Sequence, residues 1–178
     1  MPEYAWYEIV RRDVIEQGDM LRNCRVYFPP DDLSVAGIQE GQPAVEFEWA
    51  ERDVIVMSQT CDMVKGREKV REVLLCAYWT CEEIGGHLAS PRGKEDARRG
   101  NLPGYHMLAS CNLPGFASDV VVVDFRRLYS LPLSHFRSLT TGADVRIRLL
   151  PPYREHLAQA FARYFMRVGL PVDIPAFH

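Results

Sequence analysis

The polar run Ser58-Gln59-Thr60-Cys61-Asp62 directly follows an apolar stretch. Catalytic residues often lie at such a position, just after the end of a buried strand. A cysteine acts as a nucleophile only as its thiolate, which requires a nearby histidine or another cation. Histidines that could serve lie at His87, His106, His135 and His156. The sequence places none of them beside Cys61, so the pattern favours a buried cysteine with Asp62 capping the turn. Cys61 and Asp62 are kept as candidate binding residues.

Four residues have the chemistry of zinc ligands, namely Cys61, Cys76, Cys81 and His87. Structural zinc sites use closely paired ligands, such as two cysteines separated by about two to four residues. Cys76 and Cys81 stand five apart on a predicted strand, and this odd spacing puts them on opposite faces. The sequence therefore predicts neither a metal site nor a cofactor.

Basic side chains are concentrated in the segment 82–104 and on predicted strands. They are Arg92, Lys94, Arg98, Arg99, Arg126, Arg127, Arg146 and Arg148. Such a cluster could follow a single RNA strand, with Tyr105 or Trp79 available to stack on bases. Acidic residues are interleaved with them, however, which favours a solvated charged face. Arg126 and Arg127 are the candidate binding residues of this set.

The composition describes one folded domain over residues 1–178. A chain of this length falls in the range of roughly 100–200 residues that is typical of a single domain. Its 21 basic and 24 acidic residues give a formal charge of −3, which argues against duplex DNA binding by bulk charge and against intrinsic disorder.

The sequence also carries signals about location. No apolar run approaches the roughly 20 residues that cross a bilayer, and Glu3 and Glu8 stand where a signal peptide would carry lysines and an apolar stretch. The five cysteines are an odd number, which makes reduced thiols the expected state. We therefore expect a cytoplasmic protein that makes no use of a membrane.

Short strands and one terminal helix are predicted to position these residues. Strands are expected at 20–28, 44–49, 54–57, 70–79, 120–125 and 145–149, with a short edge strand at 107–108. Leu157, Phe161, Phe165 and Val168 recur at helical spacing, which predicts an amphipathic helix over 151–169. The pattern indicates an α+β, mainly β protein: a small barrel over 16–150 with insertions at 29–43 and 82–118, followed by the helix.

Four short segments follow one another along the chain in an order that resembles a known family. Gln17-Gly18-Asp19 opens a strand, and residues 52–58 (RDVIVMS), 74–80 (LLCAYWT) and 122–128 (VVDFRRL) follow it. In this order they resemble the MazF/PemK-type toxin barrel, an SH3-like fold, over residues 16–131. Asp53 departs from that pattern, because it stands where the toxins carry proline. Residues 58–62 also resemble an SQTCD signature of uncharacterised bacterial proteins, which implies no activity.

The resemblance implies metal-independent cleavage of single-stranded RNA, in which a ribose 2′-OH attacks the adjacent phosphate. Arg52 would face the charge that builds on the phosphorane, Thr80 would donate its hydroxyl, and Ser58 would orient the site. A hairpin centred on Gly66 would place Arg52 opposite Thr80 on one face. The resemblance also implies a homodimer and an antitoxin-like protein partner.

Each of these residues has an alternative interpretation. Arg52 could pair with Glu51 or with an acid on a neighbouring strand, and Ser58 and Thr80 could be ordinary hydroxyls at strand ends. The function would then be that of a non-catalytic binding module on the same barrel, recognising a protein or a nucleic acid. A fold by itself does not decide between the two.

Overall fold

A computed structural model describes residues 5–10, 14–29, 47–142 and 145–166. Its strands are β1 (Tyr7–Val10), β2 (Asp19–Phe28), β3 (Glu48–Val56), β4 (Glu72–Thr80), β5 (Tyr105–Leu108), β6 (Val121–Pro132) and β7 (Arg146–Leu149). Its α-helices are α1 (Cys81–Ile84), α2 (Pro91–Arg98), α3 (Leu133–Gly142) and α4 (Tyr153–Phe165). Short 3-10 turns, η2 (Thr60–Asp62) and η3 (Gly86–Ala89), lie between them. The predicted α+β, mainly β class is confirmed.

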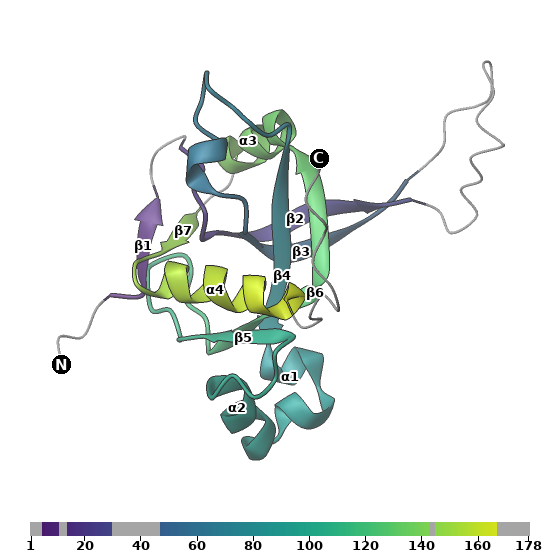
Figure 1. The fold of residues 1–178 in the computed structure, drawn as a ribbon, viewed down its shortest axis with the longest axis vertical. Helices are drawn as coiled ribbons and strands as arrows, with labels where there is room; N and C mark the ends of the chain where they lie inside the picture. Colours follow the sequence, from purple (N-terminus) through teal and green to yellow (C-terminus); the bar gives the residue numbers. More distant parts are fainter. Residues whose placement is uncertain (1–4, 11–13, 30–46, 143–144, 167–178) are drawn as a thin grey trace, which may run out of the picture.

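The seven described strands form one antiparallel sheet in the order β1-β7-β2-β3-β4-β6-β5. Figure 1 shows β4 beside β6, with β1 and β7 on the other side of the molecule and β5 near the lobe formed by α1 and α2. The edge strands β1 and β5 do not pair with each other in the described part of the chain, so the sheet is open there. Closure into a barrel is not part of what the structure shows.

Most predicted elements are present, with changes in their limits. The predicted segments 44–49 and 54–57 both overlap one strand, β3. The predicted segment 120–125 overlaps β6, which is longer and reaches Pro132. The insertion 82–118 contains α1, α2 and β5, and β5 is the expected edge strand. The terminal helix is present as α4. Sequence patterns missed β1, α1 and α3, while residues 30–46 and Val168 lie outside the described residues.

Both faces of the sheet are buried, which explains the continuous apolar run in β3. Val54 and Val56 pack with Phe136 of α3 in one cluster, whereas Ile55 belongs to a second cluster with Leu157 of α4. These side chains are fully buried. Because successive strand residues alternate between faces, an uninterrupted apolar run is what a sheet covered on both sides requires.

The outer half of β3 behaves differently from the prediction. The alternation at 44–49 predicts that Phe47 and Trp49 are on a buried side, but about half of each side chain is exposed (49% and 53%). Here β3 pairs only with β2, as a ribbon that projects from the body of the molecule (Figure 1). Trp49 is instead covered by Arg25, whose guanidinium carbon lies 4.0 Å from its ring centroid.

A buried ion cluster joins β2 to β7. The Asp19 carboxylate is fully buried and accepts a hydrogen bond of 2.6 Å from Arg148 Nε, and Arg146 Nε lies 3.7 Å from its other oxygen. The alternation in 145–149 predicts that both arginines face solvent, which is wrong: both are buried. Gly18 precedes Asp19 with a φ of 86°, a left-handed conformation that favours glycine. The Gly-Asp turn into β2 is therefore confirmed.

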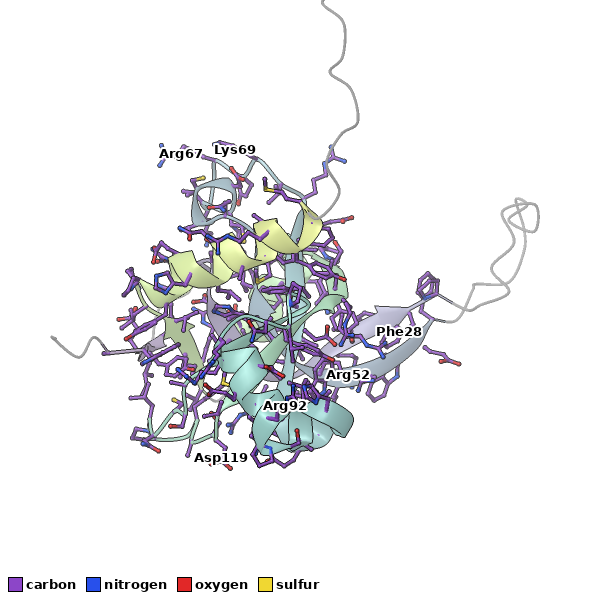
Figure 2. The ribbon with its side chains drawn as sticks, turned by 60° about the horizontal axis from the view of Figure 1, so that its bottom comes forward. Phe28, Arg52, Arg67, Lys69, Arg92 and Asp119 are labelled. Atoms are coloured by element: carbon purple, nitrogen blue, oxygen red, sulfur yellow. The ribbon has the colours of Figure 1, made fainter. Side chains whose placement is uncertain are left out.

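Removing the buried carboxylate is expected to destabilise the protein strongly. Asp19→Asn removes the carboxylate that the two buried arginines share and leaves Glu16 as the near partner of Arg148 at 2.7 Å, so the free energy of unfolding should fall by about 3–5 kcal/mol. The matched control is Asp119→Asn, an exposed position (Figure 2), which should change it by less than about 0.5 kcal/mol. Urea unfolding followed by circular dichroism measures both; equal midpoints for Asp19→Asn and the native chain would contradict this role.

Candidate nucleic-acid interface

The β3–β4 pairing differs by one residue from the predicted hairpin. Ile55 pairs with Cys76, whereas the predicted register would pair it with Ala77. Because side chains alternate between faces, a shift of one residue moves Thr80 to the face opposite Arg52. The predicted cross-strand pair of Arg52 and Thr80 is therefore wrong.

Ser58 and Thr80 lie at opposite ends of β4. The Ser58 hydroxyl oxygen accepts a hydrogen bond of 2.8 Å from the backbone N–H of Leu74. Thr80 stands six residues further along the same strand, which corresponds to roughly 20 Å. One phosphate cannot be reached by both hydroxyls, so the three predicted catalytic residues do not converge in this structure.

Thr80 has a local structural role. Its hydroxyl oxygen accepts from the backbone N–H of Glu83 at 3.2 Å, and the Glu83 carboxylate accepts from the Thr80 backbone N–H at 2.7 Å. This capping box begins α1 directly at the end of β4. It also holds the Glu83 carboxylate at a fixed place beside the strand end.

Arg52 lies on β3 opposite Cys24, where the β2–β3 ribbon begins (Figure 2). Its guanidinium donates to the backbone carbonyl of Glu51 at 2.9 Å. Glu51 is therefore the expected partner, but it binds Arg52 through its main chain and not through its carboxylate. Asp53 accepts from the backbone N–H of Asn23 at 3.0 Å, at a bulge where Asn23 has a φ of 52°. Burial raises the pKa of Asp53. Asp53 thus supports a strained backbone position.

The polar run after β3 fastens that strand end to the start of β2. The Thr60 hydroxyl accepts from the backbone N–H of Gln17 at 3.1 Å, and the Gln17 amide donates to the carbonyl of Met57 at 3.0 Å. Cys61 is exposed, which corrects the expectation of a buried cysteine. Its thiol lies 3.5 Å from Asp62, which pairs with Lys69. A binding role for Cys61 and Asp62 stays a prediction.

The candidate zinc ligands are not brought together. Cys76 and Cys81 are buried, Cys61 is exposed, and His87 pairs with Asp96 at 3.0 Å. Within the described residues, no group of three or more histidine, cysteine, aspartate or glutamate side chains is arranged to hold a metal ion.

A concave site gathers the remaining predicted residues. It has a volume of about 280 Å³ and is lined by Trp79, Glu83, Ile84, Tyr105, Asp124, Arg126 and Arg127. We call it the aromatic cleft. It lies where β4 ends and α1 begins, next to β5 and β6, so four elements contribute to it. The cleft thus unites both predicted binding arginines with both aromatic residues that the sequence suggested for stacking.

A bulge in β6 explains why two consecutive arginines line one cleft. Ala77 pairs with Asp124, but its neighbour Cys76 pairs with Leu128, so three residues of β6 lie outside the ladder. Regular alternation would have sent Arg126 and Arg127 to opposite faces. The bulge removes this constraint, and the backbone N–H of Phe125 donates instead to Gly104 at 2.9 Å.

The two arginines differ in their electrostatic surroundings. Asp124 accepts from Arg126 Nε at 2.8 Å and from Nη2 at 2.9 Å, and these bonds raise the pKa of Arg126. Arg126 also covers the Tyr105 ring, at 4.4 Å from its centroid, and contacts the Tyr105 hydroxyl. Arg127 is exposed and has no side-chain partner among the described residues. Its guanidinium N–H groups are therefore available to a ligand in the cleft.

A second hollow adjoins the cleft through Tyr105, which lines both. Its volume is about 350 Å³, and α2, β5 and α4 form its walls. We call it the basic pocket, because its charged and titratable lining residues are Arg98, Arg99, His106, His156 and Arg163. Burial and the neighbouring His156 lower the pKa of His106 to about 4. The two histidines stand fifty positions apart, and no sequence signal indicated that they share a pocket.

Comparisons with known proteins leave the family open. No protein-family model matches the chain, and no curated protein matches its sequence. The assignment of function therefore rests on the site itself. Among the described helices, none combines the length and apolar character needed to cross a membrane.

The His106 environment predicts a pH dependence of stability. Between about pH 6.5 and pH 4 the unfolded chain binds a proton at His106 that the folded chain does not, so folding stability falls as the pH is lowered. In His106→Gln this loss from pH 7 to pH 4.5 should be smaller by about 2 kcal/mol. Urea unfolding of the native chain and of His106→Gln at both pH values measures it. Identical losses in the native chain and His106→Gln would contradict the assignment.

Proposed function

We propose that the protein binds single-stranded RNA in the aromatic cleft and acts as a non-catalytic binding module. The observation that supports this most directly is the convergence of Trp79, Tyr105 and Arg127 in one concave site. Stacking of bases on aromatic side chains, combined with a cation that contacts the backbone, is how single strands are bound without sequence preference. Duplexes would be disfavoured, because their bases are already stacked.

Local charge supports the proposal although the chain as a whole is acidic. The carboxylate of Asp124 is engaged by Arg126, and Glu83 is engaged by the capping box of α1. Arg127 therefore faces the cleft without a competing side-chain partner in the described region, and the basic pocket adjoins the cleft through Tyr105, which lines both. A formal charge of −3 spread over the molecule does not prevent such a local arrangement.

The proposed lineage is the SH3-like, MazF/PemK-type barrel. It is supported by the place of the four resembling segments, which lie at the start of β2 and on β3, β4 and β6. These strands are consecutive neighbours in the sheet. The homodimer and the antitoxin-like partner that the resemblance implies are part of the same proposal.

Metal-independent endoribonuclease activity is the second candidate function. One observation favours it: the Glu83 carboxylate lines the cleft and lies 2.8 Å from the Thr80 hydroxyl. A carboxylate held there could accept the proton of an attacking 2′-OH, while a neighbouring arginine faces the developing charge. Ser58, roughly 20 Å along the strand, would have no part in this.

RNA binding is tested with a labelled single strand of about ten nucleotides, a length suited to a small single-strand site. Trp79→Ala should raise the dissociation constant about tenfold or more, because it removes one stacking surface. Arg127→Ala should weaken binding and lower the slope of log affinity against log salt by about 0.7.

The control for both variants is Arg67→Ala, an exposed arginine at the other end of the molecule from α2 (Figures 1 and 2). It should bind like the native chain. Fluorescence anisotropy measures all four proteins. Affinities unaffected by Trp79→Ala and Arg127→Ala, or no binding by the native chain, would refute the proposed site.

The two candidate functions are separated by incubating the same RNA with the protein in EDTA. The binding module leaves the strand intact, as judged by denaturing gel electrophoresis. Cleavage that is abolished by Glu83→Gln would instead support the endoribonuclease, and this variant keeps the capping box, because glutamine is also accepted at that position. Cleavage abolished only by Arg52→Ala would return the catalytic role to the residue that the resemblance implies.

A further inference from the structure

The basic pocket has the composition of an anion site. Arg98 and Arg99 come from the end of α2, and His156 and Arg163 come from successive turns of α4. His106 of β5 completes the set. Among the residues that the structure describes, no carboxylate lines the pocket. The cationic groups that two helices bring to this one hollow would be complemented by a bound anion.

The charges in the pocket are only partly compensated. Glu95 accepts from Arg98 Nε and Nη2 at 2.7 Å each, and from Arg99 Nε at 2.6 Å. One carboxylate therefore serves two arginines, and the terminal nitrogens of Arg99 keep their donors. Arg163 makes no side-chain hydrogen bond or ion pair with any described residue. Three arginines and one glutamate leave about two positive charges at the pocket, before any contribution from the histidines.

The surplus of about two positive charges matches a phosphate monoester better than a phosphodiester. An internal phosphodiester carries a single negative charge, whereas a phosphate monoester carries about −1.5 to −2 at neutral pH. Guanidinium groups bind such a group through paired hydrogen bonds, which adds geometry to the charge match. His106 and His156 add ring nitrogens that can donate a further hydrogen bond.

We propose that the basic pocket binds the terminal phosphate of the RNA strand whose bases lie in the aromatic cleft. This inference rests on the proposed function, and Tyr105 provides the link because it lines both hollows. A base stacked at the Tyr105 side of the cleft would have its terminal phosphate directed towards Arg99 and Arg163. The protein would thereby recognise the end of a strand rather than its interior.

The experiment compares three versions of one short single-stranded RNA: with a 5′-phosphate, with a 3′-phosphate, and with hydroxyls at both ends. One of the phosphorylated strands should bind about tenfold more tightly than the hydroxyl strand. Arg163→Gln and Arg99→Gln should each remove most of this difference. Arg67→Gln should keep it. Trp79→Ala should weaken all three strands by the same factor.

Inorganic phosphate serves as an independent probe of the pocket. It should compete with the tighter strand and leave the binding of the hydroxyl strand unchanged. Equal affinities for the three strands, or a difference that persists in Arg163→Gln and Arg99→Gln, would overturn the inference while leaving RNA binding in the cleft intact. Failure of all three strands to bind would instead refute the proposed function itself.

Discussion

The buried contact of Asp19 with Arg148 and Arg146 is the interaction on which the rest of this arrangement depends. Strands β2 and β7 share only two paired positions, Asp19 with Arg148 and Met20 with Ile147, so the ladder between them is short. Asp19 is the carboxylate that both buried arginines share, and Glu16 adds a second contact to Arg148 at 2.7 Å, which ties the two strands together where few backbone bonds do so. Strand β7 in turn carries β1 and leads directly into α4.

Helix α4 connects this contact to the candidate site. Leu157 is fully buried in the core, and Phe161 packs edge-on against Phe125 at 5.4 Å between ring centroids. Phe125 belongs to the β6 bulge that also presents Arg126 and Arg127. One irregularity in the sheet thus performs two tasks: it anchors the helix that forms a wall of the basic pocket, and it directs two arginines to the aromatic cleft.

The distribution of charge matters more here than its sum. Acidic side chains near the cleft are occupied by specific partners, Asp124 by Arg126 and Glu83 by the cap of α1. The cations at the hollows outnumber their partners, although the whole chain has a small negative charge. Such an excess of cations is local to one surface. In physiological salt, electrostatic interactions between exposed charges are screened beyond about 8 Å, so distant acids do not cancel it.

By itself the sequence determined the mainly β class, most strands, the edge position of β5 and the terminal helix, because local periodicity encodes which faces are buried. It also gave Arg126 and Arg127 as candidate binding residues, with Tyr105 or Trp79 available to stack on bases. Only the tertiary structure decided the hairpin register, the burial of Arg146 and Arg148, and the pocket shared by His106 and His156. The register depends on a shift of one residue, and the burial of the two arginines depends on a carboxylate more than a hundred residues away. The shared pocket depends on helix packing. None of these leaves a local pattern in the sequence.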